Sequence, residues 1–236
     1  MTTSARLADL LRSDGFAFVG SEEMRRTLER DGGLGDWRAF AGSWDDLGLD
    51  TYMADGGRYR KRRFAAFAAT ADGIVRKPHQ PHYQSRDYNS LNGGIERWFE
   101  PIESGIAAGP SMRGILALCQ SLFEQLSTIT QWHVETHQFR IEARAGTEGR
   151  PTPEGMHRDG VDFVLVLLIG RRNIARGVTT THDLSGKVLG SFTLTDPLDA
   201  ALVDDRRVMH GVTAVEPLDA REPGFRDVLV VTFRRE

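Results

Sequence analysis

The pattern of apolar and polar residues divides the chain into a helix-rich first half and a strand-rich second half. Apolar residues recur every three or four positions after Ser4 and over 112–126, and 22–30 opens with acidic residues, so these segments are predicted helices. The Gly-rich stretch 31–57 is expected to form loops and short helices over one end of a barrel. Short alternating, β-branched runs predict strands at 16–19, 132–144, 161–169, 177–183, 187–194, 198–203, 208–215 and 227–234.

These elements predict an α+β fold. Regular short strands separated by turns indicate a double-stranded β-helix core of the jelly-roll or cupin kind, which can hold a ligand between its sheets. The helices of the first half, among them the apolar stripe of 112–126, are expected to pack outside this core. The 236 residues suffice for one such core, so a single domain over 1–236 is expected.

Composition and charge exclude several classes of partner and cellular location. The net charge of −3 provides no field that would attract nucleic acid or an anionic membrane. Cys119 is the only cysteine, so an intrachain disulfide is excluded, and its helical apolar setting indicates a buried, inert thiol. The N-terminus lacks a signal-peptide pattern and the apolar run 163–169 is too short to span a bilayer, so we expect a cytoplasmic protein.

A metal-binding pattern lies between the turn-rich segment 151–160 and the buried strand that follows it. His157 and Asp159 stand two residues apart, so in an extended segment both side chains leave the same face. His210 opens another alternating apolar segment and is the best candidate for a third ligand. Two imidazoles and one carboxylate that leave other coordination positions open are the ligand set of non-haem Fe(II) oxygenases.

A basic residue precedes the last predicted strand. Arg226 stands at the start of 227–234, where it could lie at the mouth of the same barrel. A guanidinium can bind a carboxylate through two parallel hydrogen bonds. A dicarboxylate co-substrate such as 2-oxoglutarate needs this kind of partner at its far end.

Two groups of histidines are weaker candidates for metal binding. His79 and His82 lie beside prolines without an acidic or cysteine residue close in sequence, which favours a surface loop. His133 and His137 share one face of the predicted strand 132–144, but they stand well before the metal pattern.

The basic run 58–63 has three explanations. A solvated edge strand is the simplest one. Nucleic-acid binding is disfavoured, since the total charge is negative and no aromatic platform repeats nearby. On an extended strand Arg60 and Arg62 share one face, so they could instead bind a substrate carboxylate together.

Four stretches carry a resemblance to a known family. They are Tyr59-Arg-Lys-Arg-Arg-Phe64, Tyr88-Asn-Ser-Leu-Asn-Gly-Gly94, His137-Gln-Phe-Arg-Ile141 and the block 151–163. Together with the metal pattern they make the chain, from Tyr59 to its end, resemble the 2-oxoglutarate- and Fe(II)-dependent dioxygenases that hydroxylate free amino acids, the L-isoleucine dioxygenases among them. The stretch 173–183 departs from the Gly-Gly-Glu pattern of these relatives, so the pocket lining is expected to differ there.

The resemblance implies cofactors and a reaction. His157, Asp159 and His210 would bind Fe(II), and Arg226 would hold the distal carboxylate of 2-oxoglutarate. With O2, an aliphatic carbon of a free L-amino acid or a close derivative would be hydroxylated, and succinate and CO2 released. Asp159 favours hydroxylation over halogenation, because halogenases of this class open a position for chloride by losing the carboxylate.

The resemblance also suggests residues for the amino acid itself. Glu154, three residues before His157, could accept a hydrogen bond from the ammonium group, although a salt-bridging turn residue would fit equally well. Arg60 and Arg62 become plausible partners of the carboxylate.

Two other classes of protein fit part of the pattern. A Zn²⁺ hydrolase could use the same three ligands, but the sequence lacks the helix-borne His-Glu-x-x-His pair and Arg226 would have no role. A non-catalytic cupin-like protein that binds a metal or a ligand would keep the fold without turnover. No sequence feature specifies an oligomeric state or the preferred amino acid.

Overall fold

The computed structural model describes residues 3–30 and 32–236; residues 1–2 and Asp31, where the expected connecting stretch begins, lie outside the described part. The helices are α1 (Thr3–Asp14), α2 (Ser21–Glu29), α3 (Trp37–Gly42), α4 (Ser104–Ala107) and α5 (Pro110–Glu124), with a 3-10 turn η1 (Ser43–Asp46). The strands are β1 (Phe16–Val19), β2 (Arg60–Thr70), β3 (Gly73–Arg76), β4 (Trp132–Ala143), β5 (Phe163–Arg172), β6 (Ile174–Arg176), β7 (Val178–Asp183), β8 (Val188–Thr193), β9 (Ala200–Asp204), β10 (Val208–Val212), β11 (Val215–Pro217) and β12 (Gly224–Arg235).

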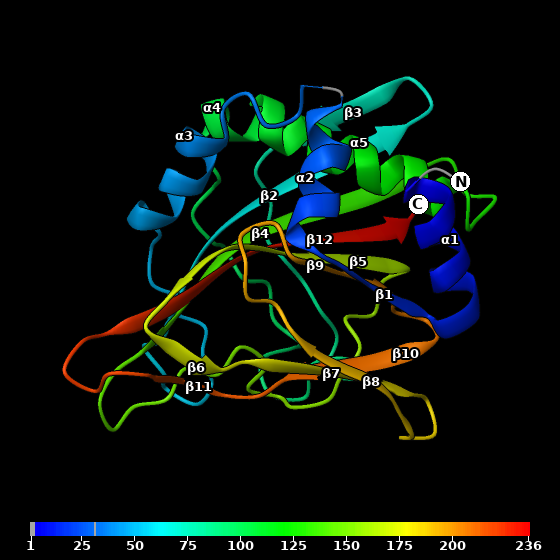
Figure 1. Cartoon of the computed structure of the whole chain (residues 1–236). Helices are drawn as coiled ribbons and strands as arrows, with labels where there is room; N and C mark the ends of the chain where they lie inside the picture. Colours follow the sequence, from blue (N-terminus) through cyan, green and yellow to red (C-terminus); the bar gives the residue numbers. More distant parts are fainter. Residues whose placement is uncertain (1–2, 31) are drawn as a thin grey trace.

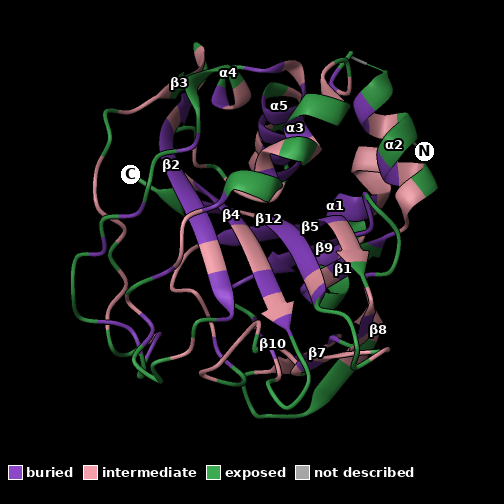
Figure 2. Ribbon diagram, turned by 90° about the vertical axis from the view of Figure 1, so that its left-hand side faces the viewer, coloured by how far each residue is buried: buried purple, intermediate pink, exposed green. Residues whose placement is uncertain are grey.

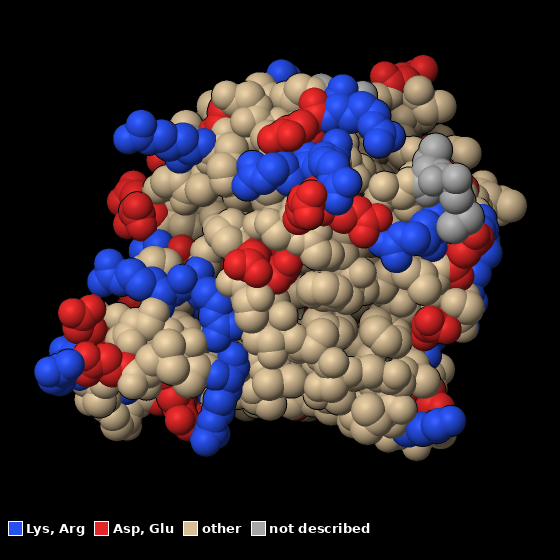
Figure 3. All heavy atoms as spheres, viewed as in Figure 1, with Lys and Arg blue, Asp and Glu red and all other residues tan. Residues whose placement is uncertain are grey.

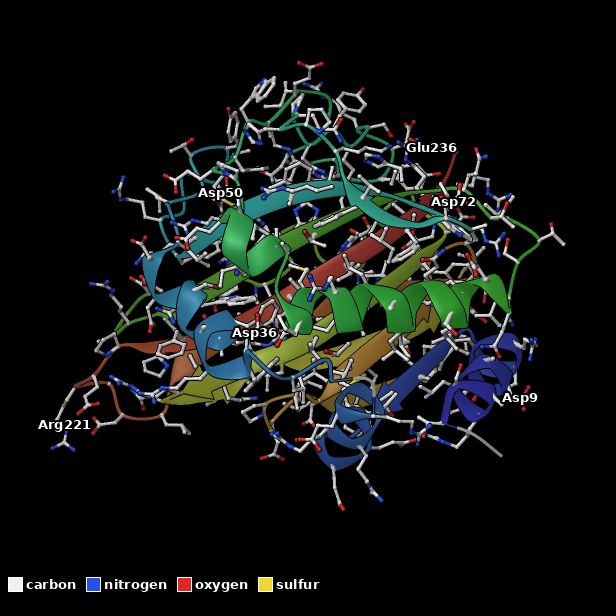
Figure 4. The ribbon with its side chains drawn as sticks, turned by 90° about the horizontal axis from the view of Figure 1, so that it is seen from above. Asp9, Asp36, Asp50, Asp72, Arg221 and Glu236 are labelled. Carbon is white, nitrogen blue, oxygen red and sulfur yellow. The ribbon has the colours of Figure 1, made fainter. Side chains whose placement is uncertain are left out.

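The strands form a large sheet with two smaller sheets on one side of it. The large sheet has seven strands in the order β1-β9-β5-β12-β4-β2-β3, and the smaller ones have the orders β10-β7-β8 and β11-β6. Helices α2 to α5 lie above the large sheet in Figure 1, and the smaller sheets lie below it. Seen from above, α5 runs across the strands of the large sheet (Figure 4). The predicted α+β class, with the helices outside the strands, is therefore confirmed.

The main apolar core lies between the helices and the large sheet. Helix α5 begins with Pro110 at its first turn, where the fixed φ of proline suits a helix start. Phe123 on this helix stacks on Phe163 of β5 with the ring centroids 4.6 Å apart. Burying a side chain of this size contributes roughly 1.5–3 kcal/mol to stability. Cys119 lies in the same core at 0% exposure, as predicted for an inert thiol.

The opposite face of the large sheet is polar in its middle. Successive side chains of a strand point to opposite faces, so Trp132 and Val134 of β4 pack against the helices. The other face of β4 lines a cavity through His133, Glu135 and His137. Figure 2 shows β2, β4 and β12 largely buried between the helices and the loops below. One face of the sheet thus holds the core, and the other is available to a ligand.

Two predictions about strands are wrong. The segment 58–63 is not a solvated edge, because β2 has neighbours on both sides. On one side it pairs with β4. On the other side the N–H of Arg62 donates to the carbonyl oxygen of Gly48, and the N–H of Asp50 donates to the carbonyl oxygen of Arg60. The predicted strand 208–215 is divided into β10 and β11. These pair with β7 and β6 respectively, so the chain changes partner sheet within the predicted strand.

The stretch 173–183, where the sequence departs from its relatives, forms β6 and β7. Asn173 and Arg176 have positive φ angles of 50° and 61°, a region that Asn adopts more readily than Arg. The Asn173 amide donates to the carbonyl oxygens of Asp219 and Glu222 at 2.9 and 2.8 Å, which fixes the turn before β6. No residue of 173–183 lines the cavity, so the departure does not alter its wall.

The outer surface carries charges of both signs. On the face shown in Figure 3, basic and acidic side chains are interspersed over the upper part and the left edge, and the lower part is mostly uncharged. None of the helices in the described residues is both long and apolar enough to cross a membrane.

Candidate active site

The polar face of the large sheet opens on a cavity of about 510 Å³. One wall comes from β2, β4 and β12, and the other from β10 and from loop residues within 80–89 and 151–161. The arginine, histidine and acidic residues of the lining are Arg60, Arg62, His82, Arg97, His133, Glu135, His137, Glu154, His157, Asp159, His210, Arg226 and Arg234. The larger apolar residues are Phe139, Ile141, Val161, Val166, Val212, Val228 and Val230.

The three predicted metal ligands meet at this cavity. His157 lies in an extended loop rather than in a strand, and it is fixed to β10 because His157 and His210 exchange backbone hydrogen bonds of 3.0 and 2.9 Å. Asp159 places Oδ1 3.6 Å from Nε2 of His157 and Oδ2 3.6 Å from Nε2 of His210. One ligand atom from each residue lies within 4.8 Å of the others. The three side chains can therefore reach a single metal ion.

The donor atoms suit Fe(II). Nδ1 of His157 lies 3.0 Å from the carbonyl oxygen of Gly155, a contact that holds the proton on Nδ1 and leaves Nε2 free to bind a metal. His157 and His210 are 9% and 7% exposed, so water has little access to the pair. Two imidazole nitrogens and one carboxylate form the facial ligand set typical of non-haem iron.

The electrostatics of the group favour a bound cation. Burial, followed by the charge of His157, lowers the pKa of His210 to about 4. Burial would raise the pKa of Asp159, but the hydrogen bond from His157 and the charge of His210 hold it well below its usual range. Burial opposes protonation of His157, yet the Asp159 and Glu154 carboxylates raise its pKa to about 9. Asp159 is thus ionised at neutral pH, and in the metal-free protein the proton taken up by His157 supplies the positive charge beside it.

A carboxylate that the sequence analysis missed supports the loop of Asp159. Asp205 is 1% exposed and accepts hydrogen bonds from the backbone N–H groups of Asp159 and Gly160 at 2.8 Å and of Val161 at 3.1 Å. Burial, together with the negative charge of Asp159, raises the pKa of Asp205 to about 7. In the sequence Asp205 belongs only to a polar turn between two strands, so no pattern identified it.

Arg226 lies in the cavity wall on β12. Its guanidinium is 2% exposed, and Nε and Nη2 have no hydrogen-bond partner in the described part of the chain. Burial, followed by the charge of Arg171 on β5, lowers its pKa to about 10, so it stays charged at neutral pH. A buried charge without a partner is costly. This residue therefore suits the carboxylate of an acidic ligand.

Arg60 and Arg62 also reach the cavity, but they have a partner within the protein. Nε of Arg60 donates to Oδ2 of Asp50 at 2.8 Å, and Nη1 of Arg62 lies 3.6 Å from the same oxygen. Asp50 is 2% exposed and lies beside β2 (Figure 4). The Arg62 guanidinium also stacks on Phe99, 3.6 Å from the ring centroid. Asp50 was not identified from the sequence, since it stands ten residues before Arg60 in the expected loop region.

A second group of two histidines and a carboxylate lines the cavity. It consists of His82, Glu135 and His137, with Oε2 of Glu135 2.8 Å from Nδ1 of His82 and 3.6 Å from Nε2 of His137. The prediction that His82 belongs to a surface loop is wrong, because its backbone pairs with Arg97 and its ring faces the cavity. His79 is exposed and does not line the cavity.

Two more charged residues of the lining have free polar atoms. Oε1 of Glu154 lies 3.4 Å from Nε2 of His157, and Oε2 is buried without a hydrogen-bond partner among the residues that the structure describes. Arg97 is 2% exposed, and its Nε and Nη2 are likewise unpartnered within 3–30 and 32–236. Arg97 lies in an irregular segment without periodicity, so no sequence pattern marks it.

Comparison with known proteins identifies the fold and the family. L-isoleucine-4-hydroxylase of Bacillus thuringiensis is 26% identical over 194 residues, which cover 78% of this chain and 80% of that protein. The 3(1)-hydroxy-L-isoleucine 4-dioxygenase of Pantoea ananatis is 22% identical over 234 residues, with 95% and 94% covered. The crystal structure of a bsmA homologue from Methylobium petroleophilum superposes with a TM-score of 0.89 at 37% identity over 98% of this chain and 93% of that one.

These similarities confirm the predicted double-stranded β-helix fold, with the N-terminal helices outside it. The 2OG-Fe dioxygenase family profile matches residues 41–232, which is most of the chain and includes all three candidate metal ligands as well as Arg226. The chain therefore belongs to the 2OG-Fe dioxygenase family, and it is an iron-binding oxidoreductase that uses Fe(II) and 2-oxoglutarate.

Proposed function

We propose that this protein hydroxylates an aliphatic carbon of a free L-amino acid and that residues 1–236 act as one catalytic domain. In the reaction, O2, 2-oxoglutarate and a C–H bond would yield succinate, CO2 and a C–OH group. The observation that carries the proposal is that His157, Asp159 and His210 share one cavity with Arg226, whose Nε and Nη2 atoms have no partner among the described residues. The two relatives whose names refer to isoleucine support an amino acid as the substrate.

The three metal ligands would have separate tasks. His157 and His210 would bind Fe(II) through Nε2, and Asp159 through its carboxylate, which leaves room for ligands on the cavity side. Fe(II), when bound there, supplies the oxidative chemistry that couples the decomposition of 2-oxoglutarate to hydroxylation. The backbone hydrogen bonds to Asp205 would keep the Asp159 loop in place while ligands exchange.

Arg226 would bind and orient the co-substrate. Its free Nε and Nη2 atoms can donate two parallel hydrogen bonds to the distal carboxylate of 2-oxoglutarate. The residue is buried on β12, so the anion would exchange water for a fixed and nearly dry partner. In the same wall Val228 and Val230 present apolar surface to the cavity. An aliphatic side chain is the substrate group that such a surface accommodates best.

The proposal predicts two observable steps. Anaerobic addition of Fe(II) and 2-oxoglutarate should produce a weak visible charge-transfer band, and this band should require both. The twenty L-amino acids are then tested for succinate release in air. If the band forms and no amino acid raises succinate release above the rate without substrate, the amino acid assignment is wrong. If neither the band nor succinate is seen, a non-catalytic binding protein is the better description.

A further inference from the structure

Arg97 is a charged residue of the cavity that has no anionic partner within the described residues; its guanidinium lies over the ring of Phe99, with Cζ 6.0 Å from the centroid. It lies in an irregular segment that exchanges backbone hydrogen bonds with His82 at 2.9 and 3.0 Å. These bonds fix its backbone beside the cavity, and its side chain is 2% exposed. The structure records no side-chain hydrogen bond or ion pair for this guanidinium within residues 3–30 and 32–236, and Nε and Nη2 are fully buried. Arg60 and Arg62, by contrast, have Asp50.

Burial makes Arg97 costly unless an anion joins it. Desolvation, followed by the charge of Arg60, lowers its pKa, and the carboxylates of Asp50, Glu154 and Glu135 oppose this effect. Within the described residues none of these carboxylates accepts a hydrogen bond from Arg97, and no ion pair joins them to it. A buried guanidinium with free N–H groups is the arrangement found where a protein binds a carboxylate.

Glu154 is the matching group of opposite charge. Glu154 and Arg97 line the same cavity, and the Glu154 carboxylate acts on the pKa of Arg97 through its charge. On the side of the metal-ligand group, Oε1 of Glu154 is 3.4 Å from Nε2 of His157. Its other oxygen, Oε2, is buried and free of hydrogen bonds in the described chain. A buried acceptor of this kind suits an ammonium group, which can donate three hydrogen bonds.

Two ligands would provide partners for the buried charged groups of the cavity that have unpartnered atoms. Arg97 and Arg226 are buried guanidinium groups without a carboxylate partner, and Glu154 is a carboxylate with an unused oxygen. The distal carboxylate of 2-oxoglutarate would neutralise Arg226, which leaves one positive and one negative group. A zwitterion with adjacent carboxylate and ammonium groups neutralises both.

We propose that Arg97 and Glu154 form a zwitterion clamp, in which Arg97 binds the α-carboxylate of the substrate and Glu154 binds its α-ammonium group. This clamp rests on the proposed function, because it requires a free amino acid. It assigns the carboxylate to Arg97 rather than to Arg60 and Arg62, which already have Asp50. Both ends of the amino acid would be held close to His157, and its side chain would face the valines of the cavity. The structure therefore favours free amino acids over peptides, whose carboxyl and amino groups are in amide bonds.

The clamp is tested by binding rather than by turnover. The protein is loaded with Fe(II) and 2-oxoglutarate without O2, and the change in the visible band is titrated with three probes: L-isoleucine, L-isoleucinamide, which lacks the carboxylate, and 3-methylpentanoate, which lacks the ammonium group. Arg97→Gln should weaken L-isoleucine binding roughly 10- to 100-fold. It should leave the binding of L-isoleucinamide unchanged. Glu154→Gln should weaken the binding of L-isoleucine but not that of 3-methylpentanoate, because the latter has no ammonium group.

Two variants control for charge and folding. Arg234→Gln removes a positive charge from the same lining, but Arg234 is exposed, so L-isoleucine binding should not change. Arg97→Lys keeps the charge and should recover part of the affinity. The band itself, which reports 2-oxoglutarate, should be unaltered in Arg97→Gln, and the thermal melting curves should show that each variant is folded.

The failures of the two proposals differ. If the wild type responds to L-isoleucine or to another of the twenty L-amino acids and Arg97→Gln responds equally to it, the clamp is wrong and the function stands. If Arg97→Gln loses the 2-oxoglutarate band instead, Arg97 belongs to the co-substrate and the clamp is again wrong. If the wild type responds to none of the amino acids, the proposed function and the clamp are both overturned.

Discussion

The cavity wall holds two groups with the same residue types, His157, Asp159 and His210 on one side and His82, Glu135 and His137 on the other. We refer to them as the 157–210 group and the 82–137 group. In the 157–210 group, Nε2 of each imidazole faces the Asp159 carboxylate at 3.6 Å. His157 also contacts Oε1 of Glu154 at 3.4 Å and, through Nδ1, a backbone carbonyl oxygen. All the charge near the two rings comes from carboxylates.

In the 82–137 group Nδ1 of each imidazole already has a close side-chain partner. Nδ1 of His82 is 2.8 Å from Oε2 of Glu135, and Nδ1 of His137 is 2.5 Å from Nη2 of Arg62. Burial would raise the pKa of Glu135, but hydrogen bonds from His133, His137 and His82 hold it well below its usual range. The guanidinium occupies the position of a cation, and it would repel a divalent metal ion at the same place.

The comparison shows that residue type does not define a metal site. Both groups offer two imidazoles and one carboxylate, with ligand atoms of each within 4.8 Å of one another. Their neighbours differ, since one group has only carboxylates and backbone around it and the other is neutralised by Arg62. We therefore expect the 157–210 group to bind Fe(II) and the 82–137 group to act as a fixed polar wall.

The largest effect is expected from removing a ligand of the 157–210 group. His210→Ala should abolish Fe(II) binding and succinate release, a loss well beyond the roughly 10- to 100-fold that changes around a metal site cost. His82→Ala, in the other group, should still bind one Fe(II) per chain. Metal content after anaerobic loading and desalting distinguishes the two. The assignment is wrong if His82→Ala loses the iron and His210→Ala keeps it.

The next effect concerns two guanidinium groups. Nε and Nη2 of Arg226 have no hydrogen-bond partner among the described residues, whereas Arg62 contacts Asp50 and His137. Arg226→Gln should lower the affinity for 2-oxoglutarate roughly 10- to 100-fold, because two hydrogen bonds to a charged group are lost. Fe(II) should still bind to this variant. The measurement is the 2-oxoglutarate dependence of the charge-transfer band. Arg62→Gln should alter this dependence much less. Equal effects of the two variants would contradict the difference we draw between them.

A smaller effect is expected from Asp205, which supports only the 157–210 group. Asp205→Ala frees three backbone N–H groups beside Asp159, and we expect Fe(II) affinity to fall on the order of 10-fold. The matched control is Asp183→Asn, since Asp183 also accepts backbone hydrogen bonds, from Ser185 and Lys187, but lies in an exposed turn. Fe(II) titrations of the two variants test the point, and equal affinities would contradict it.

The sequence predicted what local patterns encode. The alternation of β4 assigned His133 and His137 to one face, and the stripe of 112–126 predicted α5 and its buried side. The pair His157 and Asp159 was identified because two residues in an extended segment share a face, whatever the rest of the chain does. Arg226 was identified by its place at the start of a strand.

The residues that sequence analysis missed depend on contacts between distant segments. Asp205 contacts Asp159 across 46 residues, and Arg97 faces the cavity only because its segment pairs with His82. From the sequence a solvated edge and a substrate carboxylate both stayed open for Arg60 and Arg62, because Asp50, their partner inside the protein, belongs to an irregular region. No periodicity marks a lone charged residue in a loop, so its partners become visible only in the fold.

The smallest expected effect is on the pH dependence of stability in the metal-free protein, in which the two groups should differ. Burial, followed by the charge of Arg62, lowers the pKa of His137 from 6.5 to about 3. Between pH 6.5 and pH 3, His137 is protonated in the unfolded chain but stays neutral in the folded chain. The free energy of unfolding therefore falls as the pH falls. Each pH unit in this range lowers the free energy of unfolding by at most about 1.4 kcal/mol, so the two units from pH 6.5 to about pH 4.5 lower it by at most about 2.8 kcal/mol through His137.

His137→Asn should therefore flatten the decline of the melting temperature over this range, whatever its effect at pH 7. His79→Asn is the matched control, because His79 is exposed and its variant should decline as the wild type does. His210 contributes in the same direction, with a pKa of about 4, but bound Fe(II) blocks its protonation. Loading with metal should thus reduce the decline further in His137→Asn. Identical slopes for the metal-free wild type and His137→Asn would show that the 82–137 group is not the buried, neutral wall described above.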